Sequence, residues 1–194
     1  MQDFLDLIAR ARSYRRFDAS CTIDDATVRT LLDAARLTPS GANRQSIRYF
    51  PITDSDGAAF MRAHSKWAAY LKDWDGPSES ESPSAWILLL SPTELEAPKI
   101  DLGITAEATV LAATAAGLGA CIFLSIERDA IAARFGIGKE MRIDLAIAIG
   151  KPAETVRISE VRDGDIRYYR DSDGTHIVPK RSLDELIYRP AKEE

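Results

Sequence analysis

Arginine side chains gather near the start of the chain, where they could bind an anionic ligand. Arg10, Arg12, Arg15 and Arg16 lie close together with no acidic residue between them, and Ser13 adds a hydroxyl donor. The planar fork of a guanidinium group matches the oxygens of a phosphate, so this segment could hold a phosphorylated molecule. The alternative is that the cations offset the dipole at the carboxyl end of a helix, and the segment taken alone favours that interpretation.

A loop of small and polar residues, PSGANRQ at 39–45, is the second candidate for a ligand contact. Glycine and other small residues let a backbone approach a flat molecule closely. Asn43 and Gln45 carry both donors and acceptors, with which they could read the edge of a heterocycle. Taken alone, the loop is explained more simply as a connection between a helix and a strand.

Two further segments carry weaker signals. Residues 106–119 are rich in Ala, Thr and Gly. Such a helix could seat a ring or let helices of two subunits pack closely, although a central buried helix has the same composition. Lys180 and Arg181 are adjacent cations just before a capped helix, where a solvated basic patch is the simpler interpretation.

The sequence offers no recognisable machinery for side-chain catalysis. It lacks the GxSxG elbow, the P-loop and the HExxH motif, and its glycine pairs at 117–119 and 136–138 do not continue as GxGxxG. Its two histidines, His64 and His176, exclude a histidine-rich metal site. We therefore expect no catalytic side chain and no metal, and an enzyme with this sequence would rely on a cofactor for its chemistry.

Composition argues against several classes of protein. The 194 residues include 25 basic and 30 acidic ones, and the net charge of −5 argues against nucleic acid or an anionic membrane surface as a partner. Two cysteines, Cys21 and Cys121, cannot build a disulfide framework. The longest apolar run, 85–90, is too short to span a bilayer, and the first residues do not form a signal peptide. We expect a cytoplasmic protein of one domain.

Hydrophobic periodicity predicts the elements that must position these residues. Helices are expected over 3–11, from the capping pair at 22–25 to about 37, and over 56–71, 100–118 and 128–135; strands are expected over 47–53, 85–91, 121–124 and 143–149. Proline in the first of these strands favours either a place at a sheet edge or a bulge. The polar residues 73–84 predict a mobile surface loop.

The last segment, 153–194, is polar throughout and differs from the rest of the chain. It cannot bury a core of its own, so we expect it either to be disordered or to lie on another surface, such as that of a second subunit. Ser182 and Glu185 form a capping box that predicts a short helix near its end.

Five segments match a known family in the correct order along the chain. RSYRRF at 12–17 is similar to R-S-x-R-x-F, and PSGANRQ at 39–45 to P-S-x-x-N-x-Q. GLGAC at 117–121 matches the end of that family's central helix, GKP at 150–152 the close of its last core strand, and KRSLDE at 180–185 its basic carboxyl-terminal segment. Together they resemble the nitroreductase-like family of FMN-dependent NAD(P)H oxidoreductases.

The resemblance implies an α+β fold in which helices flank a central mixed or antiparallel sheet. Residues 1–152 would form the FMN-binding core, and residues 153–194 a carboxyl-terminal extension of the same domain that packs on the partner subunit. The protein would be a homodimer with FMN at the subunit interface and the long central helix at that interface.

The resemblance also assigns the cofactor contacts. They are Arg12, Ser13, Arg15, Arg16, Ser40, Gly41, Asn43, Gln45, Leu124, Ser125, Lys180 and Arg181. Arg12, Ser13 and Arg16 would meet the phosphate and ribityl chain. Arg15 would lie near N1 and the C2 carbonyl of the flavin, where a cation stabilises the anionic reduced form.

The remaining contacts are divided among other segments of the dimer. The loop residues 40–45 would come from the other subunit, the pair 180–181 would reach back to the phosphate, and residues 124–125 would approach the flavin ring. The chain departs from the family at Ala11, where a further arginine is common, and at Ser46-Ile47, where Pro-Trp is common.

The activity implied by the resemblance is reduction of a small organic acceptor, such as a nitroaromatic, a quinone or an enone. NAD(P)H would reduce FMN first, and the acceptor would then enter the vacated site in a ping-pong cycle. Alternatives within the family are a reductive dehalogenase and a flavin-consuming enzyme. A non-catalytic flavin-binding or redox-sensing protein, and a dimerisation domain without cofactor, are alternatives from other classes.

Overall fold

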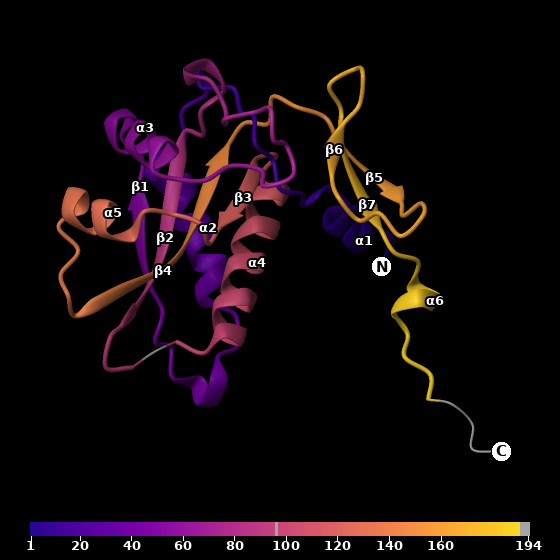
Figure 1. Ribbon diagram of the computed structural model, residues 1–194. Coiled ribbons are helices and arrows are strands. Elements are labelled where there is room, and N and C mark those ends of the chain that lie inside the picture. Colours follow the sequence, from indigo (N-terminus) through magenta and orange to yellow (C-terminus); the bar gives the residue numbers. More distant parts are fainter. Residues whose placement is uncertain (96, 191–194) are drawn as a thin grey trace.

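The computed structural model describes residues 1–95 and 97–190 (Figure 1). The elements follow in this order: α1 (Gln2–Arg10), α2 (Asp25–Arg36), β1 (Arg48–Ile52), α3 (Ser55–Ala63), β2 (Ala85–Pro92), α4 (Lys99–Ala115), β3 (Gly119–Phe123), α5 (Arg128–Phe135), β4 (Met141–Gly150), β5 (Val156–Glu160), β6 (Tyr169–Arg170), β7 (His176–Lys180) and α6 (Leu183–Leu186). Single 3-10 turns span Gly41–Asn43 and Glu79–Glu81. No helix in the described ranges is long and apolar enough to cross a membrane.

The main sheet has the strand order β1-β2-β4-β3, and every neighbouring pair is antiparallel. Its two central strands are buried on both faces, which is why their sequences are nearly continuous apolar runs rather than alternating ones. Pro51 lies in the edge strand β1, opposite Ile87 of β2. An edge strand tolerates proline because one side of it needs no ladder hydrogen bonds, so the sequence expectation for this strand is confirmed.

Helices cover both faces of this sheet, so the α+β architecture expected from the sequence is confirmed (Figure 1). Strand alternation sends Ile87 and Leu89 into a core shared with α2 and α4. Trp86 and Leu88, which alternate with them along β2, face the opposite core, with Ile131 of α5. Two hydrophobic cores on one twisted sheet give the framework on which the candidate site residues lie.

The segment between α1 and α2 extends the sheet beyond its edge strand β3. Ser13 forms a parallel bridge with Ala120, and Phe17 an antiparallel bridge with Pro152. Gly119 and Gly150, which pair across β3 and β4, leave the room that this crossing needs. A Cβ atom on Gly119 would lie 2.8 Å from the Tyr14 ring, and one on Gly150 would lie 2.7 Å from the Phe17 ring.

The carboxyl-terminal segment forms a second sheet that the sequence analysis did not predict. Its order is β5-β7-β6, with β5 and β7 parallel and β6 antiparallel to β7. His176 and Ile177 of β7 are buried, so part of this polar segment does find a core. His176 also contacts Arg15 of the amino-terminal segment, so this sheet packs on the rest of the chain.

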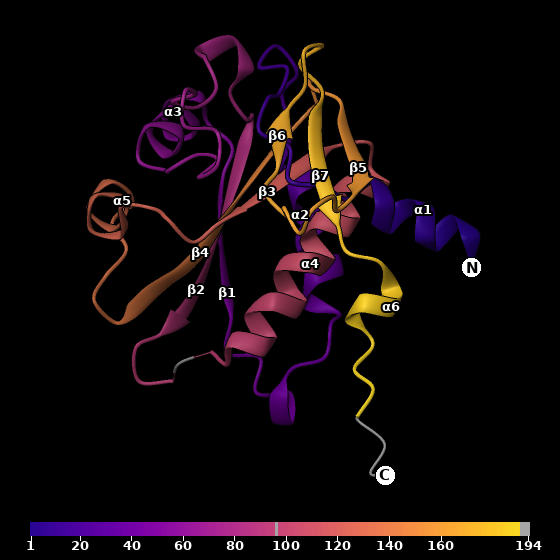
Figure 2. The same cartoon turned by 45° about the vertical axis from the view of Figure 1, so that its right-hand side comes forward.

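Beyond β7 the chain leaves the body of the molecule. The predicted helix is present as α6, with the capping box between Ser182 and Glu185 (Figures 1 and 2). The side chains of Leu183, Leu186 and Tyr188 are all more than half exposed. We call residues 183–190 the arm.

Two other expectations are wrong in detail. The helix expected over 56–71 ends at Ala63, after which Ser65 forms a bridge with Ile126 that draws the chain back to the sheet.

Residues 73–84, which were expected to form a mobile surface loop, are instead attached to the core. The N–H groups of Phe17 and Ala19 donate to carbonyls within Glu79–Glu81, and two prolines of the segment are buried. Proline rings and backbone hydrogen bonds can anchor a segment that has few apolar side chains.

Candidate functional site

The arginines after α1 have different partners, although their sequence context is shared. The Nη2 group of Arg12 donates to the carbonyl of Ile8 at 2.8 Å, so it satisfies one of the free carbonyls at the end of α1. This is the helix-end role that the sequence allowed for the arginine segment. The Nε group of Arg12 is buried and makes no hydrogen bond among the described residues.

Arg16 is occupied by contacts within the chain. Its guanidinium pairs with Glu81 at 3.3 Å, and its backbone N–H donates to Glu154 at 3.1 Å. The guanidinium also lies 5.8 Å from the ring centre of Trp74. Arg16 therefore joins the amino-terminal segment to residues 73–84.

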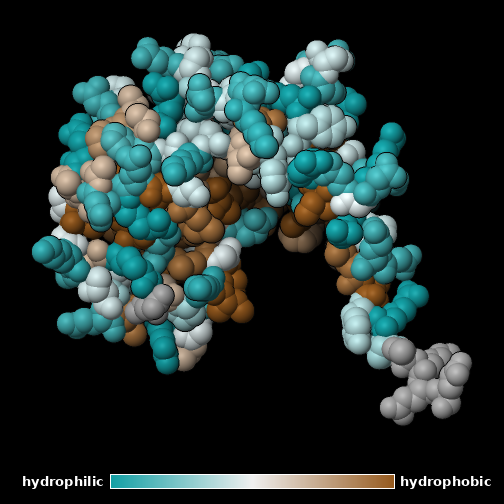
Figure 3. All heavy atoms as spheres, in the orientation of Figure 1, coloured by the Kyte–Doolittle hydropathy of each residue, from teal (hydrophilic) through white to brown (hydrophobic). Residues whose placement is uncertain are grey.

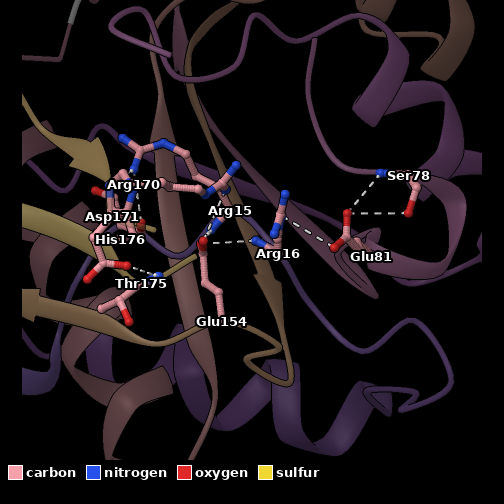
Figure 4. A network of polar contacts seen from close by, with 10 residues as sticks. Arg15, Arg16, Ser78, Glu81, Glu154, Arg170, Asp171, Thr175 and His176 are labelled. Carbon is pink, nitrogen blue, oxygen red and sulfur yellow. Dashed lines mark hydrogen bonds and ion pairs between the residues drawn. The ribbon is translucent and has the colours of Figure 1, made fainter. Parts of the chain in front are cut away.

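Arg15 has no carboxylate partner in the part of the chain that the structure describes. Its Nη1 group donates to the Ser13 carbonyl at 3.2 Å and lies 2.9 Å from Nε2 of His176. Its guanidinium stacks over the Tyr168 ring, 4.5 Å from the ring centre. Figure 4 shows Arg15 beside His176. A half-buried cation without a counter-ion is the feature expected where an anionic group binds.

Glu154 fixes the backbone on which these arginines lie. Its side chain is only 2% exposed and forms an ion pair with Arg170 at 3.1 Å. It also accepts hydrogen bonds from the backbone N–H groups of Arg15 and Arg16 (Figure 4). Sequence reasoning missed Glu154 and Arg170, because no local pattern connects them to a segment near residue 15.

His176 is fully buried at the start of β7. Burial, and after it the neighbouring guanidinium of Arg15, lower its pKa to about 4, so the imidazole is neutral near pH 7. A guanidinium can only donate, so Nε2 accepts from Arg15 and the ring proton resides on Nδ1. Nδ1 makes no hydrogen bond with any described residue.

The loop 39–45 lies at the start of α4, where Asp101 holds it. The backbone N–H of Gly41 is 3.1 Å from each carboxylate oxygen of Asp101, which is 2% exposed. Ala42, Asn43 and Gln45 all have positive φ angles, a conformation that is costly for residues with a Cβ atom. Backbone strain of this kind is concentrated at functional sites.

The same loop borders a small pocket. Ser40 and Gln45 line a cavity of about 280 Å³ together with Asp101 and Thr105 of α4. The Ser40 hydroxyl accepts from the backbone N–H of Gln45 at 3.2 Å. The sequence analysis did not single out Asp101, whose role depends on a loop far from it in the chain.

The two predicted halves of the site lie at opposite ends of α4. Gly41 contacts Asp101 in the first turn of this helix, whereas Ser13 lies beside Ala120, just after its last turn. At a rise of 1.5 Å per residue, Asp101 and Ala115 are about 21 Å apart along the axis. Within one chain the structure does not bring these two groups of residues together.

An apolar groove lies between α4 and the ends of β3 and β4. It has a volume of about 650 Å³, and its apolar lining includes Leu102, Ala106, Ile122 and Leu124. Leu124 is 66% exposed. Figure 3 shows apolar atoms at the surface over β3 and α4. Side chains of this kind and a volume in this range are typical of sites for small molecules.

The predicted residues at the ends of β3 and β7 have the following positions. Ser125 is exposed beyond β3, and its carbonyl accepts from the backbone N–H of Lys66 at 2.9 Å. Lys180 is the last residue of β7 and forms no ion pair in the described ranges, while Arg181 pairs with Glu185 at 3.7 Å. Figures 1 and 2 both place this end of β7 beside α1.

Neither a metal centre nor a reactive thiol is evident at the site. Across residues 1–95 and 97–190, no three His, Cys, Asp or Glu side chains gather closely enough to hold a metal ion. Cys121 is buried in β3, and burial raises the pKa of its thiol to about 11. A thiol with such a pKa is almost entirely protonated at neutral pH and is a poor nucleophile.

One protein family matches most of this chain. The family model described as the nitroreductase family matches residues 8–151, a range that includes the amino-terminal arginines, the loop 39–45 and the whole main sheet. The chain belongs to the nitroreductase family. The resemblance seen in the sequence is therefore confirmed.

Solved structures from several bacteria share the nitroreductase fold. A protein of Desulfovibrio desulfuricans, solved in complex with FMN, is 22% identical, with a TM-score of 0.69 and coverage of 97% of both chains. A nitroreductase family protein of Clostridium novyi NT is 19% identical, with a TM-score of 0.65 and coverage of 94% of this chain and 97% of the other. An FMN-dependent nitroreductase of Clostridium difficile R20291 is 17% identical, with a TM-score of 0.63 and coverage of 83% of this chain and 93% of the other.

Proposed function

We propose that this nitroreductase-family protein binds FMN and uses NAD(P)H to reduce a small organic acceptor. The observation that carries the proposal is Arg15, a half-buried guanidinium that has no carboxylate partner among the described residues. A negatively charged or electron-rich group placed there would be stabilised, as the flavin edge requires when the ring gains electrons. Structural relatives that hold or depend on FMN support the choice of cofactor.

The residues present fit FMN in both charge and shape. Arg15 and Lys180 are cations without an ionic partner in the described ranges. Ser13 is exposed, and its carbonyl accepts from Arg15. Ile122 and Leu124 offer an apolar surface to a flat ring at the groove described above. Arg12, Arg16 and Arg181 have partners in the chain, so each would contact the phosphate only by exchanging or sharing a partner.

The separation along α4 supports a homodimer. Ser40, Gly41, Asn43 and Gln45 lie about 21 Å along the helix axis from the end that bears Ser13, too far to join it within one chain. A second copy arranged about a two-fold axis would bring its loop 39–45 to this end and would receive the same in return. The exposed apolar side chains of the arm would then pack on the partner.

These positions indicate what the cofactor and the residues of the chain would each do in the reaction. Bound FMN supplies two-electron redox chemistry between a nicotinamide and an organic acceptor. Arg15 would hold negative charge at one edge of the ring, and the apolar groove would exclude water from it. Nicotinamide and acceptor would occupy the groove against the flavin in turn, which would be a ping-pong cycle.

The experiment that tests the proposal is purification without added cofactor, followed by a visible spectrum and identification of any chromophore released on denaturation. We expect FMN at about one molecule per subunit, and parallel double-reciprocal plots when NAD(P)H and a quinone are varied. A colourless protein that takes up no added FMN would contradict the proposal. Binding of FMN without NAD(P)H oxidation would indicate a flavin-binding protein instead of an enzyme.

Arg15→Ala tests the residue that carries the proposal. Loss of a charge-assisted hydrogen bond to the cofactor costs about 1.5–3 kcal/mol, so we expect the dissociation constant for FMN to rise about tenfold to a hundredfold. Arg167→Ala is the matched control, because Arg167 is an exposed arginine that pairs with nearby Asp165. Equal FMN affinities for the two variants would contradict the role of Arg15.

A further inference from the structure

The environment of the Arg15 guanidinium is built by the carboxyl-terminal segment that contains the second sheet, which no part of the family match covers. The match ends at residue 151, whereas His176, Tyr168 and Glu154 all lie beyond it. Each of these three contacts Arg15, the imidazole at 2.9 Å, the phenol ring at 4.5 Å and the carboxylate through the backbone N–H. An arginine in the amino-terminal segment is therefore oriented by a small sheet of its own chain.

His176 is the contact that fixes the direction of the guanidinium. Its backbone N–H donates to the Thr155 carbonyl at 2.8 Å, and its position in β7 is set by pairing with both Val156 and Arg170. The imidazole ring lies 5.2 Å from the Tyr168 ring, so the same two side chains border Arg15 from two directions. A fully buried side chain on a central strand has little freedom to follow a moving arginine.

The charges around Arg15 explain why a neutral acceptor is needed at this position. Arg170 and Arg15 are both cations, and Glu154 forms its ion pair with Arg170. A carboxylate in place of the imidazole would neutralise Arg15, and a protonated imidazole would repel it. A neutral imidazole holds the guanidinium by one N–H group and leaves its positive charge available to a ligand.

The geometry points to His176 as a positioning residue that holds the Arg15 guanidinium toward the FMN site. This inference rests on the proposed function, because it is FMN that Arg15 would meet. His176 itself would touch neither cofactor nor substrate. Its removal would let Arg15 turn among several rotamers, and part of the binding free energy for FMN would be lost to ordering the side chain again.

A double-mutant cycle on the holoprotein tests this inference. FMN affinity is measured by fluorescence titration, and the midpoint potential of bound FMN is measured beside it, for wild type, His176→Phe, Arg15→Ala and the double variant. We expect His176→Phe to weaken FMN binding about tenfold and to lower the potential. In the Arg15→Ala background the same change should have less than about a twofold effect on affinity.

Two further variants separate positioning from packing. His176→Gln keeps an acceptor at a reach similar to Nε2, so we expect it to bind FMN within about twofold of wild type. Ile177→Val removes a methylene group from the adjacent buried position of β7 and is the packing control, with FMN affinity unchanged. If His176→Phe does not fold, His176→Asn takes its place, because its shorter amide does not reach Arg15.

The outcomes distinguish failure of the inference from failure of the proposed function. Wild-type protein that binds no FMN overturns the proposed function, and the inference with it. FMN binding that is weakened equally by His176→Phe with and without Arg15 overturns the inference alone. Wild-type affinity and potential in His176→Phe overturn it as well, whereas rescue by His176→Gln supports it.

Discussion

At the scale of single residues, the amino-terminal arginines show how identical side chains acquire different roles from their neighbours. Arg12 satisfies the end of a helix, Arg16 pairs with Glu81, and the Arg15 side chain meets a carbonyl, a neutral ring and an aromatic face but no carboxylate among the described residues. The contact with a neutral acceptor is what leaves Arg15 available to an anionic ligand. The motif identifies the segment, but the partners decide which of its cations are available.

The buried imidazole makes a prediction about stability and pH. His176 has an ordinary pKa of 6.5 and a folded-state pKa of about 4, with Arg15, Arg170, Glu154 and Tyr168 around it. Between these two values the unfolded chain binds a proton that the folded chain does not. The free energy of unfolding should therefore fall as the pH drops from about 6.5 to about 4.

Urea unfolding at pH 7.5 and pH 4.5, with the same FMN concentration, measures this loss. We expect His176→Gln to lose less stability than wild type over this interval, because glutamine does not titrate. The carboxylates are the same in the two proteins, so their contribution to the loss of stability cancels in the comparison. Equal losses in the two proteins would show that His176 already takes up a proton in the folded state.

At the scale of elements, a pair of glycines joins the main sheet to the amino-terminal segment. Gly119 and Gly150 pair across β3 and β4, and the rings of Tyr14 and Phe17 pack directly on them. This packing places Ser13 beside Ala120 and sets the direction of the residues that follow it. The glycines are required by close approach rather than by an unusual backbone angle.

Gly150→Ala tests this packing. A Cβ atom at residue 150 would lie 2.7 Å from the fully buried Phe17 ring, so the ring or the strand must move. Overpacking of this kind costs about 1–3 kcal/mol, and we expect that loss in chemical denaturation. The control is Lys151→Ala at the neighbouring exposed position, which should change stability by less than about 0.5 kcal/mol. Wild-type stability in Gly150→Ala would show that the segment does not pack tightly here.

At the scale of the whole molecule, the arm and the two ends of α4 suggest that one chain is half of a site. The arm projects from the body with Leu183, Leu186 and Tyr188 exposed (Figure 2). Exposed apolar side chains in a row are costly for an isolated chain and are typical of a surface that a partner covers. The proposed dimer would cover them and complete the FMN site in one step.

Substitution of Leu183 and Leu186 by aspartate tests the dimer without disturbing the fold of one chain. Both side chains are more than 60% exposed, so neither contributes to the core of the monomer. We expect the dimer to dissociate at concentrations at least tenfold above those for wild type, measured by analytical ultracentrifugation, with FMN lost in parallel. Leu95→Asp, at an exposed turn after β2, is the control. A variant that remains dimeric would show that the arm does not carry the interface.

Local patterns along the chain were enough to predict the family, the strands of the main sheet and most of the helices. Continuous apolar runs specify β2 and β4 because both strands are buried on two faces. The capping box at Ser182 begins α6 locally, whereas α2 begins at the cap Asp24 rather than at the expected pair 22–25. The segments RSYRRF and PSGANRQ identify the nitroreductase family because each depends on short-range spacing.

Which of the predicted residues have partners within the chain became evident from the folded structure. It brought Glu154, Arg170 and His176 to Arg15, and Asp101 to Gly41, contacts between positions that no local pattern connects. It also formed β5, β6 and β7 within the polar residues 156–180, where His176 and Ile177 are buried and His176 and Tyr168 contact Arg15. Hydrogen bonds and ion pairs of this kind depend on distances in space, which spacing along the chain does not encode.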